Sequence, residues 1–395
     1  MMMRKLNDSL VCLAHSSMGA HRAALCFLVA MLTAAPANSQ NVPVSDYMCR
    51  PVSVVDEAGQ AVFGIEDMAH DVRNGRLFLS AYDRFAAMRA MENGAEPPGG
   101  GLYAVDVDLL KSRRDEEGSV PVSTLDIRVP GDLLLHPHGI GLFDDGEALR
   151  LAVVNRLTDM HDASAADLLL FDVDGQSLAM VGRGSGDLFC RANDVALLDA
   201  STAVFTYDQS RCGAWGVWAE RVFQPRSSGL RLSRFDGGNA DAEPVLDDIA
   251  FANGVAISPD GASLLMTASR DQALRVFDKQ ALLDGNTDPK LVVSFEGGPD
   301  NVSIAPDGSS VTAVHPDPFA LFLHINGWGD LPESSVVISS ADGASQQTIA
   351  GPPGTMPGAA TSAVMLGDQI IVSSAWDAGL GICSPHQPAR TAVQQ

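Results

Sequence analysis

The sequence predicts an all-β chain that folds as a six-bladed β-propeller with four-stranded blades. Six segments share one form, a polar residue followed by alternating apolar residues, and a second strand-like run follows each. Turn dipeptides such as Asn74-Gly75 and Asp145-Gly146 join the two runs, since glycine supplies the positive φ that hairpins require. The polar residues recur every 48 to 72 residues, a length that suits a four-stranded blade.

The two runs of each blade can be located in order along the chain. The first runs are GIEDMAHD from position 64, HPHGIGLF from 136, RANDVALL from 191, FANGVAIS from 251, GPDNVSIA from 298 and ATSAVMLG from 360. The second runs are RLFLSA, LRLAVVNR, TAVFTYD, SLLMTAS, SVTAVHP and QIIVSSA. Because the first strand of a propeller blade lines the central channel, we expect the polar residues to meet near one axis.

Carboxylates and amides occupy many of these polar positions. They are Glu66, Asn193, Asn253, Asp300 and Asn301. A single Asn or Asp is usually a turn residue, but turn residues have no reason to recur at one point in each blade. An all-oxygen set of this kind is typical of calcium, whereas zinc prefers His or Cys. The pattern therefore predicts a metal site at the axis.

Composition narrows the class of protein. Hydrophobic residues make up 46% of the 395 residues, enough for a large core, and no stretch after the N-terminal region reaches the ~20 apolar residues of a membrane span. The formal net charge of −23 disfavours a nucleic-acid partner, because phosphates would be repelled. Motifs of the GxGxxG, P-loop and Cys-x-x-Cys types are absent, so no further cofactor is predicted. The oligomeric state is left open.

The N-terminus has the pattern of a secretion signal over residues 1–37. The basic pair His21-Arg22 precedes an apolar run, and Ala35-Pro36-Ala37 has the form of a cleavage site. Translation from Met18 would give a signal of ordinary length. We expect a secreted or periplasmic chain; an uncleaved anchor is the alternative. Residues 38–395 would form a single propeller domain, with a disordered tail after about residue 385.

Export makes disulfide bonds possible. Cys49 and Cys383 lie at opposite ends of the propeller sequence, where the ring must close, and we predict that they are bonded. On the chain-entropy model a loop of this length contributes at most about 5 kcal/mol. Cys190 and Cys212 bracket one hairpin and could form a second bond, but neither sequence nor spacing decides this pairing.

Four motifs carry a resemblance to a known family. LLLHPHGIGLF, RANDVAL, FANGVAISPDG and PDNVSIAPDG resemble the paraoxonase/arylesterase family of calcium-dependent hydrolases, and the similarity runs from about Cys49 to Cys383. The resemblance implies a propeller with two central calcium ions that hydrolyses small aryl esters and lactones. The related gluconolactonase-type propellers usually hold one metal, whereas the adjacent pairs Glu66-Asp67 and Asn193-Asp194 suit two ions, since neighbouring side chains on a strand point to opposite faces.

By the resemblance, each ion has its own ligand set. An open catalytic calcium would be held by Glu66, Asn193, Asn253, Asp300 and Asn301. A buried structural calcium would be held by Asp67, Asp194 and the backbone carbonyl of Ile140.

Three further residues match catalytic or cavity positions of the family. His138, in Pro137-His138-Gly139-Ile140, is the proposed base, although a lone histidine is more often a hydrogen-bonded core residue. Asp208 would orient or activate water, and His315 would lie at the cavity wall. His136 has no family counterpart.

One departure from the family concerns the catalytic dyad. The family places a second histidine after the run Val153-Val154-Asn155, where this chain has Arg156. Arginine cannot relay a proton near neutral pH, because its pKa exceeds 12. Arg156 could instead keep His138 neutral by charge repulsion, or bind an anionic part of the substrate.

These residues predict hydrolysis at a carbonyl, with calcium as Lewis acid and His138 or Asp208 activating water. A GxSxG motif is absent, which disfavours a covalent acyl-enzyme. The alternatives are a non-catalytic, calcium-stabilised binding scaffold and a gluconolactonase-like sugar lactonase. Trp215, Trp218 and Val222 have helical spacing and suit either a lid or a packing helix. The segment from Met91 to Gly101 is expected to be a flexible loop.

Overall fold

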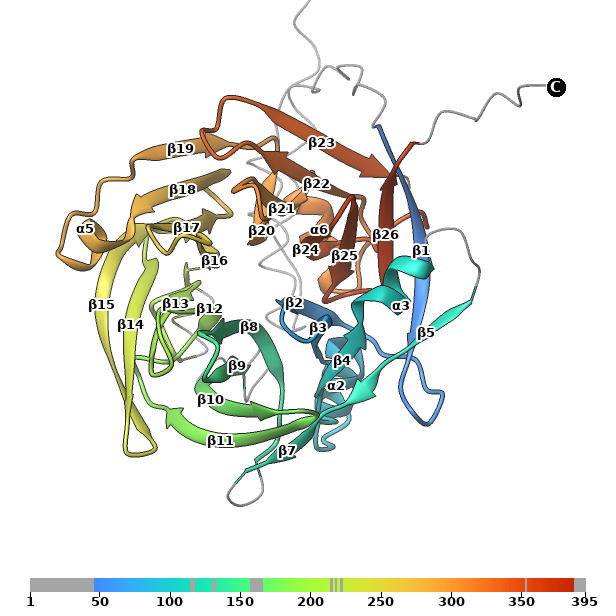
Figure 1. Cartoon of the computed structure of the whole chain (residues 1–395), viewed down its shortest axis with the longest axis horizontal. Helices are drawn as coiled ribbons and strands as arrows, with labels where there is room; N and C mark the ends of the chain where they lie inside the picture. Colours follow the sequence, from blue (N-terminus) through green and yellow to red (C-terminus); the bar gives the residue numbers. More distant parts are fainter. Residues whose placement is uncertain are drawn as a thin grey trace, which may run out of the picture. The chain divides into compact units, whose positions relative to one another are not determined.

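Sheets arranged around a common centre make up most of the described chain (Figure 1). The computed structural model describes residues 46–113, 118–129, 133–156, 166–213, 216, 219–220, 223–351 and 354–386. The predicted signal peptide, the residues Trp215, Trp218 and Val222, and the tail after position 386 lie outside these ranges. Within them the prediction of an all-β, propeller-like fold is confirmed.

Three sheets have four strands each. They are β2 (Ile65–Asp71), β3 (Arg76–Ala81), β4 (Gly101–Asp106) and β6 (Ser123–Thr124); β16 (Ala252–Ile257), β17 (Ser263–Ala268), β18 (Ala273–Asp278) and β19 (Leu291–Ser294); and β20 (Gly298–Ile304), β21 (Ser310–His315), β22 (Ser334–Ser339) and β23 (Gln346–Gly351).

The other two sheets are larger. One contains, in spatial order, β24 (Ala360–Leu366), β25 (Gln369–Ser374), β26 (Leu380–Pro385), β1 (Tyr47–Val55) and β5 (Ser119–Pro121). The other contains β12 (Ala192–Leu197), β13 (Thr202–Tyr207), β14 (Ser228–Asp236), β15 (Asn239–Ile249), β11 (Ser177–Gly184), β10 (Ala166–Asp174), β9 (Leu149–Arg156) and β8 (Pro137–Asp144), with β7 (Asp126–Arg128) paired to β11.

The described residues form five sheets, whereas the sequence predicts six blades, and the nine-stranded sheet accounts for the difference. Its halves β8–β11 and β12–β15 are joined by a single parallel pair, Arg183 with Asn239. Each half is itself a run of antiparallel neighbours. The sheet count alone therefore does not decide the number of blades.

The six predicted first runs form the strands nearest the centre. They are β2, β8, β12, β16, β20 and β24, and each contacts the next until β24 contacts β2 and closes the circle. Figure 1 shows these strands around the centre, with the last strands of the sheets at the periphery. The polar positions are therefore carried on adjacent inner strands.

The N-terminal strand closes the ring. β1 pairs antiparallel with β26, and Cys49 stands opposite Cys383 in the register. The two cysteines, which are 334 positions apart in the sequence, form a disulfide bond. A second disulfide joins Cys190 to Cys212, the pairing that the sequence left open.

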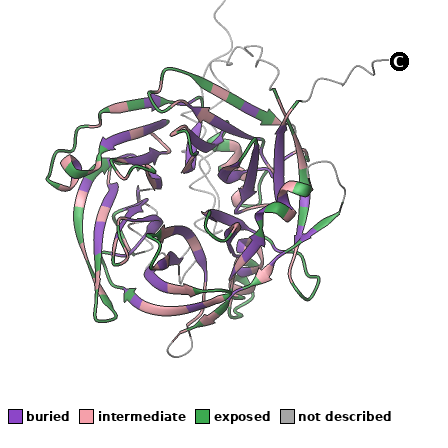
Figure 2. Ribbon diagram, in the orientation of Figure 1, coloured by how far each residue is buried: buried purple, intermediate pink, exposed green. Residues whose placement is uncertain are grey.

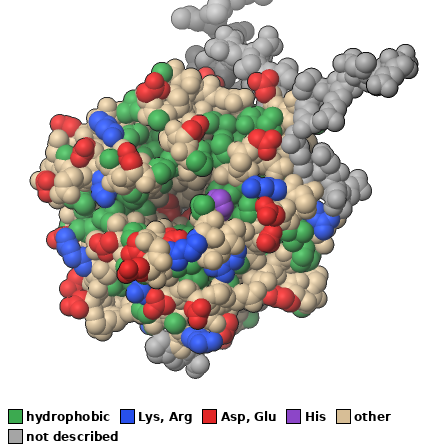
Figure 3. Space-filling view, viewed as in Figure 1, with side chains coloured by type: hydrophobic (Ala, Val, Ile, Leu, Met, Phe, Trp, Pro, Cys, Tyr) green, Lys and Arg blue, Asp and Glu red, His purple; other side chains and the backbone are tan. Residues whose placement is uncertain are grey.

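Apolar side chains fill the spaces between neighbouring sheets and between the two halves of the nine-stranded sheet. One such cluster includes Val154 and Leu168 from β9 and β10 together with Val195 and Phe205 from β12 and β13. Figure 2 shows the inner strands as mostly buried and the peripheral strands as partly exposed. This core holds the inner strands in place. On the face drawn in Figure 3, acidic and basic side chains are intermingled, and the centre of this face is hollowed.

Four helices with assigned bounds lie between the strands in the described part of the chain. They are α2 (Arg84–Glu92), α3 (Val107–Ser112), α5 (Lys279–Leu283) and α6 (Pro318–Ile325). The expected loop from Met91 to Gly101 is shorter at both ends, because Met91 and Glu92 complete α2 and Gly101 begins β4. Asp83 caps the first turn of α2. In the described ranges, none of the helices is both long and apolar enough to cross a membrane.

Candidate functional site

All six inner strands lose register with their neighbouring strand at the predicted site positions. The shifts lie between Ile65 and Asp67, Pro137 and Ile140, Ala192 and Val195, Ala252 and Val255, Pro299 and Val302, and Ala360 and Ser362. A β-bulge removes residues from the ladder and re-aims their side chains. Glu66, His138, Asn193, Asn253 and Asp300 all lie in such bulges, which the sequence pattern did not reveal.

Glycines let the bulges of neighbouring strands approach closely. A Cβ on Gly139 would lie 2.4 Å from Oδ1 of Asp194 and 2.7 Å from the carbonyl oxygen of Asn193. A Cβ on Gly254 would lie 2.6 Å from Cα of Asn301. No side chain can make such contacts, so glycine at these two points lets the polar residues of adjacent strands sit side by side.

Hydroxyl groups of the sheets hold the bulged backbone. Thr267 accepts a hydrogen bond from the N–H of Gly254 at 2.7 Å and donates to the carbonyl oxygen of Asp300, in the next sheet, at 2.6 Å. Comparable bonds to bulged carbonyl oxygens run from Ser80 to His138, from Thr206 to Asn253 and from Thr361 to Glu66. These side chains escaped the sequence analysis, because a single Ser or Thr in an apolar strand carries no distinctive signal.

The Thr267 hydroxyl provides a test of this account of the backbone. We expect Thr267→Val to lower the free energy of unfolding by about 1–3 kcal/mol, because the Gly254 N–H and the Asp300 carbonyl would lose a buried partner. The matched control is Thr312→Val, since the buried Oγ1 of Thr312 has no hydrogen-bond partner among the described residues. Urea unfolding of both variants measures the difference; equal losses would contradict the account.

Three buried asparagines on consecutive inner strands keep an amide oxygen free. In the part of the chain that the structure describes, Oδ1 of Asn193, Asn253 and Asn301 accepts no hydrogen bond, although these residues are at most 6% exposed. The amide nitrogen of Asn253, in contrast, donates to Ser269 Oγ at 3.1 Å. Buried polar atoms are rarely left without a partner, and an ion is one of the usual reasons.

Glu66 adds a carboxylate to these amides. Its Oε2 accepts a hydrogen bond from Arg84 Nη2 at 2.7 Å, and its Oε1 lies 3.5 Å from Asn301 Nδ2. Burial raises the pKa of Glu66 to about 8; Arg84 opposes this rise, whereas Asp300 and Asp67 add to it. A divalent cation would relieve the repulsion among these carboxylates. Arg84 is a residue that the sequence analysis missed, because one arginine after a strand resembles an ordinary surface charge.

The donor set fits calcium. No group of three or more His, Cys, Asp or Glu side chains within the described ranges is placed to hold a metal ion, so a cation here would depend on amide oxygens as well. Carboxylate and amide oxygens together are the ligands that calcium takes in proteins. The free Oδ1 atoms are the observation that supports the fit.

The residues predicted to hold a structural ion are also buried, but the carboxylate oxygens of the two aspartates already accept hydrogen bonds. Asp67 accepts hydrogen bonds from the Ile140 N–H and the Ser362 hydroxyl, each at 2.9 Å. Asp194 accepts from the N–H groups of Val195 and Val255, each at 2.7 Å. Burial raises the pKa of Asp67 to about 6 and that of Asp194 well above its usual value. Asp67 and Asp194 therefore differ from the three asparagines, whose Oδ1 atoms accept no hydrogen bond from the described residues.

The raised pKa values predict how stability depends on pH without metal. In the folded protein, burial favours the protonated forms of Glu66, Asp67 and Asp194. Their contribution to the free energy of unfolding is therefore fully present below about pH 4 and is lost as the pH rises toward 8. In chelator we expect Tm to fall by roughly 5 °C or more between pH 5 and pH 8. Excess calcium should flatten this slope, and a flat profile in chelator would contradict the pKa assignment.

His138 lies beside the carboxylate of Glu66. Its Nδ1 is 3.0 Å from Glu66 Oε2, although the angles are not those of a hydrogen bond, and its side chain is 13% exposed. Burial, followed by the guanidiniums of Arg156, Arg84 and Arg191, holds the pKa of His138 well below 6.5. A lowered pKa favours the neutral imidazole, one of the two effects that the sequence analysis left open for Arg156, although burial contributes more than the guanidinium.

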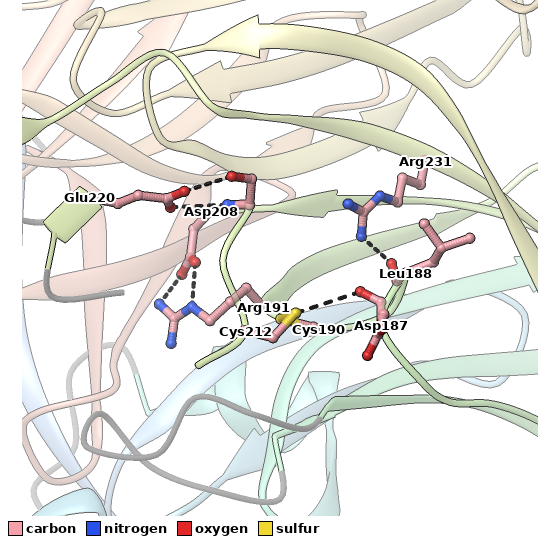
Figure 4. The surroundings of a disulfide bond; sticks show 9 residues. Asp187, Leu188, Cys190, Arg191, Asp208, Cys212, Glu220 and Arg231 are labelled. Carbon is pink, nitrogen blue, oxygen red and sulfur yellow. Dashed lines mark hydrogen bonds and ion pairs between the residues drawn. A yellow bond between two sulfur atoms is a disulfide. The ribbon is translucent and has the colours of Figure 1, made fainter. Parts of the chain in front are cut away.

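Asp208 lies between two guanidiniums. It accepts two hydrogen bonds from Arg191, each at 2.8 Å, and one from Arg156 Nη2 at 2.8 Å. Burial raises the pKa of Asp208, but the two guanidiniums outweigh this effect and bring it below its usual value. Figure 4 shows Arg191 reaching Asp208 from the residue next to the Cys190–Cys212 disulfide. The sequence analysis did not single out Arg191, whose φ is +60°.

Two further histidines singled out in the sequence have structural contacts. His315, at the end of β21, places Nε2 2.8 Å from Asp300 Oδ2. His136 is buried, stacks on Tyr82 with ring centroids 4.2 Å apart, and contacts the carbonyl oxygen of Arg156 through Nδ1 at 3.1 Å. A cavity of about 560 Å³ near Asp260 lies elsewhere, and no predicted site residue lines it.

Known proteins are similar to much of this chain in sequence and in fold. The family model described as Arylesterase matches residues 54–350. Serum paraoxonase/arylesterase 1 of Mus musculus is 24% identical over 273 residues, and that of Homo sapiens is 24% identical over 282 residues; each match covers 67% of this chain and 70% of the relative. Among solved structures, a luciferin-regenerating enzyme aligns with a TM-score of 0.48 and 14% identity, over 86% of this chain and 95% of that one.

Proposed function

Because this chain belongs to the arylesterase family, we propose that it is a secreted, calcium-dependent hydrolase of carboxylic esters and lactones. The observation that supports this best is the juxtaposition of a neutral His138 with the Glu66 carboxylate, in a ring of inner strands that also carries the free amide oxygens of Asn193, Asn253 and Asn301. A protein that needed calcium for structure alone would not require this arrangement around a base.

In this proposal five residues hold the catalytic calcium. They are Glu66, Asn193, Asn253, Asp300 and Asn301. When bound, calcium supplies a Lewis acid that polarises the substrate carbonyl and stabilises negative charge on its oxygen. His315 orients Asp300 through their 2.8 Å contact, and Arg84 orients Glu66 through its ion pair at 2.7 Å.

His138 is the base in this proposal, in preference to Asp208. A neutral imidazole can take a proton from the attacking water. The carboxylate of Asp208 is already bound by Arg191 and Arg156, so a proton on Asp208 would disrupt these two ion pairs. We assign to Asp208 the role of holding Arg156 in place. In this scheme water attacks the carbonyl carbon directly and passes a proton to His138. When the ester C–O bond then breaks, His138 returns this proton to the leaving oxygen.

The remaining features of the proposal concern architecture and location. We count six blades, because a single pair joins the halves β8–β11 and β12–β15 of the nine-stranded sheet. A second, structural calcium would be held by Asp67, Asp194 and the Ile140 carbonyl. Secretion is favoured by the two disulfides, which form in oxidising compartments, and the name of the mammalian relatives places them in serum.

The experiment that tests the function is an initial-rate assay on a small aryl ester and a set of lactones. The purified chain is assayed in calcium, after chelation, and after calcium is returned. We expect activity to disappear on chelation and to recover. A folded chain that binds calcium but turns over none of these substrates would contradict the proposal and favour a binding scaffold. A parallel calcium titration distinguishes one bound ion from two.

A further inference from the structure

We propose that Arg156 binds an anionic group on the substrate, so that the preferred esters or lactones carry a carboxylate near the scissile carbonyl. This inference rests on the proposed function and names the substrate class for the same site. The residue is assigned a role in binding and selectivity, and the proton transfer stays with His138.

Arg156 is held in one position by contacts on two sides of its guanidinium. Its Nε donates to the carbonyl oxygen of Ala192 at 2.8 Å, and Nη2 donates to Asp208 Oδ2 at 2.8 Å. The second terminal nitrogen, Nη1, has no partner among the residues that the structure describes. A guanidinium fixed in this way loses little conformational freedom when it binds a planar carboxylate.

The support behind Arg156 is rigid. Arg191 donates two hydrogen bonds to Asp208. The Cys190–Cys212 disulfide links the residue before Arg191 to the segment after Asp208 (Figure 4). Arg191 is 7% exposed, whereas Arg156 is 18% exposed. Of the two guanidiniums that share Asp208, Arg156 is therefore the one that a ligand can reach.

The local charge also favours an anion at Arg156. One carboxylate, Asp208, stands between two guanidiniums, which leaves this group of three residues with one positive charge. Arg84 is neutralised separately by Glu66. Asn193 Nδ2 donates to Asp208 Oδ2 at 3.4 Å, the same oxygen that Arg156 Nη2 binds at 2.8 Å, so Arg156 lies close to a predicted metal ligand. The backbone N–H of Arg156 also donates to the carbonyl oxygen of His136 at 3.0 Å, two residues before the predicted base. A carboxylate bound there would lie next to the reacting carbonyl.

The test compares two lactones that differ in one group. One carries a carboxylate near the ring carbonyl and the other carries a carboxamide in its place. The ratio of kcat/KM for the carboxylate to that for the carboxamide is measured for the wild type and for Arg156→Gln, Arg156→Lys and Arg234→Gln. Arg234 is an exposed arginine paired with Glu243, far from this cluster in the fold, and serves as the matched control.

We expect the wild type to prefer the carboxylate by at least about 10-fold, and Arg156→Gln to lower the ratio by about 10- to 100-fold, the range for a hydrogen bond to a charged group. Arg156→Lys should keep part of the preference through its charge, and Arg234→Gln should keep all of it. Turnover of both lactones with an unchanged ratio in Arg156→Gln would overturn the inference alone. Turnover of neither, by a folded and calcium-loaded protein, would overturn the proposed function and the inference with it.

Discussion

Replacing His138 with glutamine should lower kcat on aryl esters and lactones by about 10²- to 10⁴-fold, the usual contribution of a general base. Glutamine keeps much of the size and polarity of the imidazole but cannot take a proton from water. Because the neighbouring carboxylate and amides remain, calcium affinity should stay close to that of the wild type. Steady-state kinetics and a calcium titration on the same preparation separate the two effects.

His136→Gln is the matched control for this variant. His136 lies two residues away, but it is 1% exposed and stacks on Tyr82 instead of reaching Glu66. We expect this change to lower Tm and to retain most of kcat. If His138→Gln kept kcat within about threefold of the wild type, His138 would not be the base, and Asp208 would have to be reconsidered.

Removing the side chain of Asn253 should weaken calcium binding by at least 10- to 100-fold, the loss that is typical even of residues that only support metal ligands. Its Oδ1 is buried and lacks a hydrogen-bond partner among the described residues, so the proposed cation is its natural partner. Hydrolysis should fall with calcium occupancy and recover in part at high calcium. Isothermal titration calorimetry measures the affinity directly.

Asn239→Ala provides the comparison for Asn253→Ala. Asn239 is an exposed residue at the start of β15, where it faces solvent at the hairpin. We expect this variant to bind calcium like the wild type. Equal calcium affinities for Asn253→Ala and Asn239→Ala would show that the free amide oxygen of Asn253 does not bind the ion.

Much of the fold could be predicted because its signals are local. The alternation of apolar residues and the Gly-containing turns located both strands of each hairpin, from β2 with β3 to β24 with β25. The parallel pairings of β1 with β5 and β7 with β11 were not predicted, since β5 and β7 have only three residues each. Helix α2 was not predicted, and its last two residues, Met91 and Glu92, were assigned to a loop because a glycine-rich and proline-rich segment follows them at once.

The site was only partly predictable, and the reason is geometric. Recurring polar residues such as Asn193 and Asn253 could be located from the sequence, and the structure carries them on adjacent inner strands. The bulges that turn their side chains depend on how whole sheets pack, which a single sequence does not display. Arg84 and Arg191 were missed for the same reason, since only the folded chain brings them to Glu66 and Asp208.

The most direct test of the central claim is a crystal structure of the protein grown in millimolar calcium. The account predicts an ion within about 2.3–2.6 Å of Oδ1 in Asn193, Asn253 and Asn301, the usual calcium–oxygen distance. It also predicts that the same ion contacts Glu66 and leaves a position open beside His138. A calcium-saturated structure in which the three amide oxygens bind no ion would contradict the account.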